Sequence, residues 1–348
     1  MGKKILHIAP QNFAGMPFGF MQMQAQAGHT SRLVTMYQNT LNFEEDISLN
    51  FRLPVNKAAK LWRDSKIGGL KHYKPKNFLE STYFKLRDFK NRSKITALID
   101  KHKLYDYDVY HFDGGMDFFR DLRFAKELKR RNKKIVCCYF GSDLRSRGVF
   151  KELDDMSDLN LTVEYDHLHL HQNIHYLFFP YDVNKVEYKF SELNKLRIIH
   201  SPTNRLFKGT DKIIKVIDEI KKTNNFEFIL AENISREKLL EMKKTCNLSI
   251  DQVGGELGGS GYGKNSVENL AMGIPTITEF SNEYLDFLPE NPFISCAINN
   301  LKSTILYYIE NVTALKEVSL NGRQWVEKYH SYESVNAKLE QLYRENNI

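Results

Sequence analysis

Short apolar runs alternate with helix-like stretches along the chain, and this alternation occurs in two series. Each run is four to seven residues long, which suits a buried strand. Short buried strands that alternate with helices favour parallel sheets with helices on both faces. The two series therefore predict an α/β protein with two Rossmann-like domains. The runs lie at residues 5–9, 30–36, 109–112, 135–140, 159–163 and 176–179 in the first series, and at 196–200, 226–230, 248–251 and 275–278 in the second.

A polar segment at residues 181–189 separates the two series. We place the domain boundary there, which gives an N-terminal domain over 1–185 and a C-terminal domain over 186–330. The last helical pattern predicts a separate C-terminal helix over 331–348. Because ligands of parallel sheets bind beyond the carboxyl ends of the strands, the expected site is the cleft between the two domains.

The overall composition is that of a soluble globular protein. Of the 348 residues, 42% are apolar and 27% are charged. No window holds about 18 consecutive apolar residues, so no membrane span is expected. Cys137, Cys138, Cys246 and Cys296 have neither a disulfide framework nor zinc-site spacing, which favours a reducing compartment. The sequence therefore predicts a cytoplasmic location.

Residues 57–103 concentrate positive charge. They contain 14 Lys or Arg against four Asp or Glu, while the whole chain has a net charge of +7. Aromatic residues, among them Trp62, Phe78 and Phe89, are interleaved with these charges. Such a segment suits an anionic membrane surface at the inner face, or an acidic acceptor, and equally a solvated helical face. No nucleic-acid module accompanies the charge, so no nucleic-acid partner is expected.

Residues 199–211 join a strand to a helix through a loop that holds two cations. Arg205 can donate two hydrogen bonds to phosphate oxygens, and Lys208 supplies a compact charge. This pair suits the stabilisation of a diphosphate leaving group as its charge develops. The alternative interpretation is a helix-start loop with solvated charges.

Residues 258–275 combine a glycine-rich loop with the start of a helix. Glycines let the backbone approach a ligand closely, and the helix that begins near Asn265 points N–H groups at an anion. Glu268 lies one turn further and can accept hydrogen bonds from sugar or ribose hydroxyls. The alternative interpretation is a tight loop that packs a helix on a strand.

Together, these two segments resemble the retaining family-four glycosyltransferases of the GT-B fold. Those enzymes carry a Lys-Gly pair after the first strand of the C-terminal domain, as Lys208-Gly209 does here, and a helix that ends in Ala-Met-Gly-x-Pro. The resemblance covers nearly the whole chain and implies two Rossmann-like domains that face each other across a cleft, with the C-terminal helix returning to the N-terminal domain. Further matches lie at residues 12–15, 27–29, 108–111 and 140–143.

The resemblance assigns residues to three roles: binding of the donor, catalysis and contact with the acceptor. The donor-binding candidates are Gly15, Asn204, Arg205, Lys208, Gly263, Asn265, Ser266 and Glu268. The candidate catalytic residues are Lys208, Arg205, Glu268 and Asp143, and the acceptor side would be formed by His111 and Asp143. In this family, protein cations stabilise the leaving nucleotide instead of a metal, so no metal or other cofactor is expected.

The implied reaction moves a sugar from a nucleotide-diphosphate donor to a glycan, a lipid-linked molecule or another acceptor, with retention of configuration. A nucleotide-sugar epimerase-like enzyme and a non-catalytic sugar-nucleotide-binding protein on the same fold remain alternatives. Ser260 motivates the second alternative, because the family often has its first Glu there; Glu256 or backbone amides would have to replace it. Phe140 also departs from the family, which often has a histidine at that position.

Four histidines between residues 167 and 175 form a separate cluster. Their spacing allows a metal site, but no acidic motif accompanies them. The alternative interpretation is an exposed polar segment. The cluster consists of His167, His169, His171 and His175.

Overall fold

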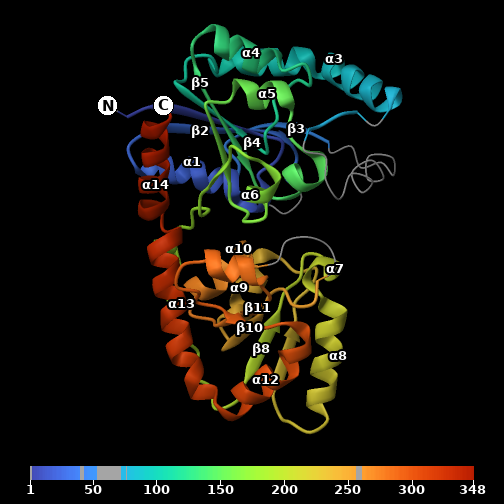
Figure 1. The fold of residues 1–348 in the computed structure, drawn as a ribbon, viewed down its shortest axis with the longest axis vertical. Coiled ribbons are helices and arrows are strands. Elements are labelled where there is room, and N and C mark those ends of the chain that lie inside the picture. Colours follow the sequence, from blue (N-terminus) through green and yellow to red (C-terminus); the bar gives the residue numbers. More distant parts are fainter. Residues whose placement is uncertain (1, 40–42, 53–71, 76, 256–260) are drawn as a thin grey trace. The chain divides into compact units, whose positions relative to one another are not determined.

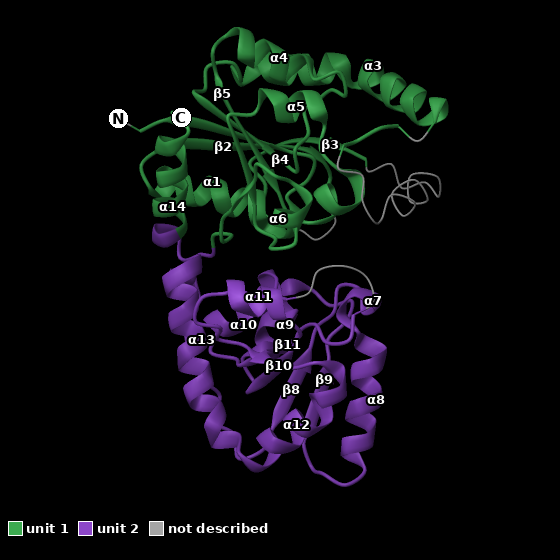
Figure 2. Ribbon diagram, in the orientation of Figure 1, with its two compact units in different colours: residues 1–180, 335–348 green, residues 181–334 purple. Residues whose placement is uncertain are grey.

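The chain folds into two compact units, each with its own sheet (Figures 1 and 2). Unit 1 comprises Met1–Pro180 and Val335–Ile348, and unit 2 comprises Tyr181–Ser334. The division at Pro180 lies five residues before the boundary that the sequence analysis placed at 185. The computed structural model describes residues 2–39, 43–52, 72–75, 77–255 and 261–348.

Unit 1 contains a parallel sheet in the order β3-β2-β1-β4-β5-β6-β7. The central strands β1 and β4 are almost wholly buried, as expected for strands with helices on both faces. The bounds are β1 (Lys4–Ala9), β2 (Thr30–Tyr37), β3 (Ile47–Phe51), β4 (Val109–Asp113), β5 (Lys134–Tyr139), β6 (Leu159–Thr162) and β7 (His175–Tyr176).

Helices pack on both faces of this sheet. Ile95 of α3 and Phe124 of α4 belong to one large core with Tyr110 and Cys137 of the strands. On the other face, Met21 of α1 packs with residues of β1 and β2. The helices of this part of the chain are α1 (Met16–Gln26), α3 (Phe78–Lys101), α4 (Arg123–Arg130), α5 (Lys151–Met156) and α6 (His167–Leu170).

The last helix, α14 (Tyr332–Glu345), returns to the N-terminal domain, as the sequence analysis expected. From Val335 onwards it belongs to unit 1. Tyr343 is fully buried there, and its hydroxyl accepts a hydrogen bond from Gln24 Nε2 at 3.2 Å and is hydrogen-bonded to His111 Nε2. The C-terminal segment therefore completes the core of unit 1.

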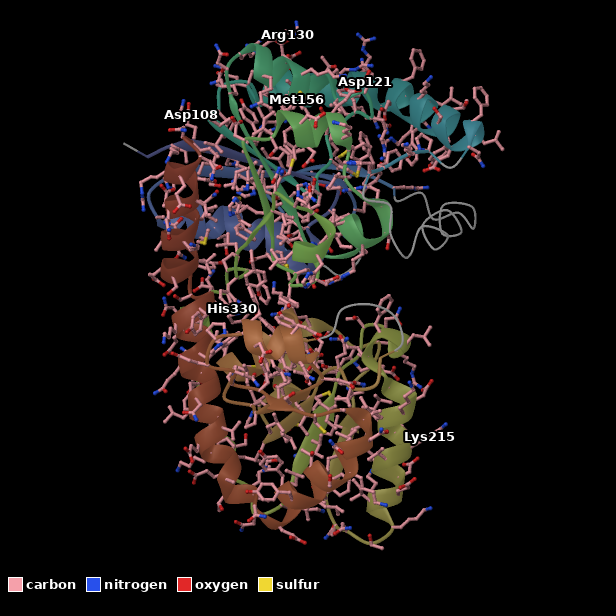
Figure 3. All side chains as sticks on the ribbon, viewed as in Figure 1. Asp108, Asp121, Arg130, Met156, Lys215 and His330 are labelled. Atoms are coloured by element: carbon pink, nitrogen blue, oxygen red, sulfur yellow. The ribbon has the colours of Figure 1, made fainter. Side chains whose placement is uncertain are left out.

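Unit 2 has a second parallel sheet, in the order β12-β11-β10-β8-β9. Ile198 and Ile199 of β8 point to opposite faces: Ile198 packs with α8 and α12, and Ile199 packs with the face that α9 covers. The outer side of α8 carries exposed charges such as Lys215 (Figure 3). The strands are β8 (Arg197–His200), β9 (Glu227–Leu230), β10 (Leu248–Ile250), β11 (Thr276–Thr278) and β12 (Ile294–Ser295). The helices are α7 (Arg205–Lys208), α8 (Thr210–Lys221), α9 (Arg236–Lys243), α10 (Lys264–Ala271), α11 (Asn282–Phe287), α12 (Leu301–Glu310) and α13 (Leu315–His330).

The sequence of residues 117–131, which ends in basic residues, predicts a helix, but in the structure α4 begins only at Arg123. The carboxylate of Asp117 accepts hydrogen bonds from the amides of Phe119 and Ala125 at 3.1 and 2.8 Å, and Leu122 adopts a left-handed φ of 59°. These local bonds hold residues 117–122 in a turn, because they compete with the backbone hydrogen bonds of a helix.

Among the described residues, no helix is both long and apolar enough to span a membrane.

Candidate functional site

The candidate donor residues of unit 2 gather at the carboxyl edge of its sheet. His200 ends β8, and the neighbouring strands β10 and β9 are followed by Asp251 and Glu232. The short helix α7 follows β8 and brings Arg205 and Lys208 to this edge, since each of them pairs with one of those two carboxylates. In parallel sheets this edge is where ligands bind.

Lys208 is held inside this region. Its ammonium lies 2.7 Å from Asp251 Oδ1, and its side chain is 17% exposed. Burial raises the pKa of Asp251, but the charge of Lys208 and hydrogen bonds from Lys208, Ser266 and Asn265 outweigh burial and hold the pKa below its usual value. Asp251 is therefore a carboxylate that fixes the direction of the Lys208 side chain.

Arg205 has a different environment. Its guanidinium forms a bidentate ion pair with Glu232, in which Nε and Nη2 each lie 2.8 Å from a carboxylate oxygen. Its Nη1 lies 2.6 Å from Asp211 Oδ1. Its side chain is 44% exposed. The arginine that was predicted to bind phosphate is thus already paired with two carboxylates. To bind a diphosphate, Arg205 must first release Glu232 or Asp211.

Asn204 and Gly209 shape the turn that carries these cations. The side chain of Asn204 caps α7 by accepting hydrogen bonds from the amides of Leu206 and Phe207 at 3.0 and 3.4 Å. Gly209 adopts a left-handed φ of 67°, and a Cβ at this position would lie 1.9 Å from the carbonyl oxygen of Val253. Glycine is therefore required at position 209 by the close approach of this turn to the chain after β10.

The start of α10 faces the same carboxylate. Gly263 caps the helix, and its carbonyl accepts hydrogen bonds from the amide of Ser266 at 3.0 Å and the amide of Val267 at 3.2 Å. Asn265 Nδ2 donates to Asp251 Oδ1 at 3.0 Å, and the Ser266 hydroxyl also donates to Asp251. The side chains of Asn265 and Ser266 therefore lie beside Lys208, whereas the Ser266 amide, expected to grip the diphosphate, is already bonded within the helix start.

Glu268 is held by two cations from α9. Its carboxylate lies 2.7 Å from the Lys243 ammonium and is also paired with Arg236. Glu268 is 2% exposed. Burial raises its pKa, but the charges of Lys243 and Arg236 outweigh burial and hold the pKa below its usual value, so Glu268 is ionised near neutral pH.

A single polar network connects these groups. The Lys243 ammonium also donates to Asn265 Oδ1 at 2.7 Å, which links the Glu268 pair to Asp251 and Lys208. The sequence analysis missed Asp251, Lys243 and Arg236. Asp251 directly follows a predicted strand, which is a usable signal, but nothing in the helical pattern around residue 243 distinguishes that lysine from its exposed neighbours.

Gly15 lies in unit 1, directly before α1. It adopts a left-handed φ of 71°, and the preceding turn is tied by Asn12, whose side-chain oxygen accepts a hydrogen bond from the Phe18 amide at 3.2 Å. This loop follows β1, so Gly15 lies at the carboxyl edge of the unit 1 sheet. Its predicted contact with the donor phosphates stays a prediction.

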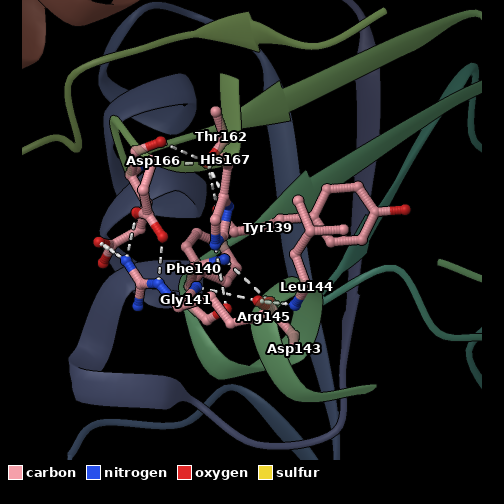
Figure 4. Close-up of polar contacts among 10 residues, drawn as sticks. Tyr139, Phe140, Gly141, Asp143, Leu144, Arg145, Thr162, Asp166 and His167 are labelled. Carbon is pink, nitrogen blue, oxygen red and sulfur yellow. Dashed lines mark hydrogen bonds and ion pairs between the residues drawn. The ribbon is translucent and has the colours of Figure 1, made fainter. Parts of the chain in front are cut away.

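Asp143 is occupied by its own loop (Figure 4). Its carboxylate accepts hydrogen bonds from the amides of Phe140, Gly141 and Leu144 at 2.8 to 2.9 Å. The residue therefore fixes the turn between β5 and the single π-helical turn η2 (Asp143–Arg147). Its expected role on the acceptor side stays a prediction, but its structural role is clear from these three bonds.

His111 is not at the surface of unit 1, contrary to what a contact with an acceptor requires. Its ring is 0% exposed and lies 4.4 Å from the ring of His7, and Nε2 is hydrogen-bonded to the Tyr343 hydroxyl. Burial, with a smaller contribution from the charge of His7, holds the pKa of His111 well below its usual value. The neutral ring therefore belongs to the interior beneath α14.

The histidines at 167–175 do not come together as one cluster. His167 is hydrogen-bonded to Thr162 Oγ1 and to the Gly141 carbonyl, at 2.7 and 3.0 Å (Figure 4). His171 instead lies 2.8 Å from Asp154. Among the residues that the structure describes, the group of three possible metal ligands is a different one, namely the buried His7, His111 and Asp113. Glu256 and Ser260, which the sequence analysis singled out, lie outside the described residues.

Three solved structures are similar in fold to this chain over nearly their full lengths. Sucrose-phosphate synthase from Thermosynechococcus elongatus is 13% identical, with 99% of both chains covered and a TM-score of 0.59. HepE from Anabaena, solved with UDP-glucose, is 10% identical, with 99% of this chain and 100% of that chain covered and a TM-score of 0.58. A putative UDP-N-acetylglucosamine 2-epimerase from Listeria monocytogenes is 10% identical, with 99% and 97% covered and a TM-score of 0.58.

The fold is GT-B. This confirms the predicted pair of Rossmann-like domains. No family model matches the sequence, and no curated protein matches it at a significant level. Since the structures of sucrose-phosphate synthase and of a protein described as a putative epimerase are both similar to this one, the fold by itself does not select one reaction.

Proposed function

We propose that this chain is a glycosyltransferase that moves a sugar from a nucleotide-diphosphate donor to a glycan or lipid-linked acceptor. The observation that carries the proposal is the placement of Lys208. Its ammonium is fixed by Asp251 beside the first turn of α10, at the ligand-binding edge of the unit 2 sheet. A cation and a helix N-terminus at one place suit a diphosphate.

The similar structures support a nucleotide-sugar substrate. HepE was solved with UDP and with UDP-glucose, and the epimerase-like protein is named for a UDP-sugar. We further propose that Lys208 stabilises the leaving diphosphate without a metal and that the sugar is transferred with retention, as the sequence resemblance implies. Glu268, which is ionised and buried beside the half-exposed Arg236, would accept hydrogen bonds from the donor ribose.

Release of nucleotide from a donor tests this proposal. The protein is incubated with UDP-, GDP- and ADP-sugars, and free nucleotide is measured with and without EDTA. We expect slow release from one donor class, unaffected by EDTA. An epimerase would instead change the sugar while the nucleotide stays attached, and a binding protein would release none. Loss of release with EDTA, restored by Mg²⁺, would contradict the metal-free mechanism.

We also propose that unit 1 attaches to an anionic membrane surface through α3. The first half of this helix exposes Phe78, Leu79, Leu86 and Phe89, each at least 64% exposed. Lys85, Lys90 and Arg92 lie on the same helix, at the borders of this apolar face. An apolar stripe flanked by cations is the arrangement of an interfacial helix.

Sedimentation with lipid vesicles checks this attachment. Binding to phosphatidylglycerol vesicles is expected to exceed binding to phosphatidylcholine vesicles and to weaken as salt rises. The double change Phe78→Ser and Phe89→Ser should weaken binding at least fivefold, while Leu320→Ser, an exposed leucine of unit 2, should not change it. Equal binding to both kinds of vesicle would contradict the proposal.

A further inference from the structure

The two cations that hold Glu268 differ in their surroundings. The side chain of Lys243 is 0% exposed, whereas that of Arg236 is 44% exposed. Both come from α9, Arg236 from its first residue and Lys243 from its last. One partner of the Glu268 carboxylate is thus enclosed in unit 2, and the other can reach solvent.

The enclosed ammonium serves two acceptors. It donates to Glu268 Oε1 and to Asn265 Oδ1, both at 2.7 Å. Asn265 is thereby oriented so that its Nδ2 donates to Asp251 Oδ1, the same oxygen that accepts from Lys208. A buried ammonium is unfavourable unless it is paired and hydrogen-bonded, and Lys243 meets both conditions only in this arrangement.

We propose that Lys243 is the positioning residue of the donor site. It holds Glu268 ionised and fixes the side chain of Asn265, so that α10 presents both groups in one geometry. Arg236 is the exchangeable partner, which a bound nucleotide displaces from Glu268 while Lys243 stays in place. This inference rests on the proposed function, because it concerns the binding of a nucleoside diphosphate.

Titration calorimetry with UDP, GDP and ADP tests the inference on the full chain. Lys243→Met removes the ammonium and keeps the aliphatic stem, and it should weaken binding of the preferred nucleotide at least tenfold. The matched control is Lys244→Met, since Lys244 is the next residue but is 59% exposed and pairs with Glu241 at the surface. The control should bind within twofold of the wild type, and Arg236→Ala should lose less affinity than Lys243→Met.

The pH profile separates positioning from a purely structural role. With Lys243 removed, the pKa of Glu268 rises, so between pH 7 and pH 5 the affinity of Lys243→Met should fall more steeply than that of the wild type, while protonation of the nucleotide's own terminal phosphate affects both proteins alike. Lys243→Gln, which retains a hydrogen-bond donor, provides the same test if Lys243→Met does not fold. Equal affinities and parallel pH profiles for Lys243→Met and Lys244→Met would overturn this inference alone. A wild type that binds none of the three nucleotides would overturn the proposed function and this inference with it.

Discussion

Replacing Lys208 with alanine should lower the rate of nucleotide release from the donor by about 100-fold or more. The ammonium is the cation fixed beside the start of α10, and the leaving diphosphate gains negative charge as the sugar departs. A fixed cation at that position stabilises the transition state more than the ground state. The measurement is nucleotide release at saturating donor, so that kcat is compared directly.

Two further variants show whether the charge of Lys208 is responsible. Lys215→Ala removes an exposed lysine of α8 and should leave the rate unchanged. Lys208→Arg keeps the charge with a different shape and should recover part of the activity. A Lys208→Ala rate within threefold of the wild type would exclude the assigned role. Because this substitution also removes the main counter-charge of Asp251, each variant is first compared with the wild type by circular dichroism.

The fold was largely predictable because its strands are short, apolar and buried on both faces. Each of the ten predicted runs overlaps a strand between β1 and β11. Nine agree with the strand within one residue at each end, and the run at 176–179 overlaps β7 at Tyr176 alone. The sequence did not reveal β3 or β12, which lie at the edges of their sheets. Edge strands are less buried, and β3 exposes its residues 48–50 at least in part, so its apolar pattern is weak.

The sequence predicted several residues of the candidate site, but it did not predict which of them form ion pairs with one another. Asn265, Ser266 and Lys208 come together as expected, because α7 and α10 follow neighbouring strands of one sheet. The bond between Lys243 and Glu268 joins residues 25 positions apart on different helices. That pairing depends on how α9 packs against α10, which no local pattern encodes.

The acceptor-side candidates show the limit of transferring a motif. His111 and Asp143 both match the family pattern, yet burial beneath α14 encloses one, and three backbone amides occupy the other. Whether a matched side chain faces a ligand depends on its neighbours in space. Tyr343, more than 200 positions away from His111, could not be identified as such a neighbour from the sequence.

Glu268→Ala should destabilise unit 2 by about 3–5 kcal/mol. The substitution leaves the Lys243 ammonium buried, with Asn265 Oδ1 as its remaining acceptor in the network described above. Urea unfolding at pH 7 measures the change. Trp325, which is buried in unit 2, reports the transition in a Trp62→Phe background, because the chain has two tryptophans. Glu241→Ala, which removes an exposed glutamate of α9, should change stability by less than about 0.5 kcal/mol.

The double variant Glu268→Gln with Lys243→Met separates the ion pair from general damage to the core. Removing both charges leaves no buried ion unpaired, so its stability should exceed that of Glu268→Ala.

The pH dependence of the stability that Glu268 contributes has a definite sign. Because the folded pKa of Glu268 is below its unfolded value, its contribution is fully present above about pH 4.5 and is lost as pH falls through the folded pKa. The stability difference between the wild type and Glu268→Gln should therefore shrink on acidification below pH 4.5, and a difference that grew would show that Glu268 is not the ionised partner of Lys243.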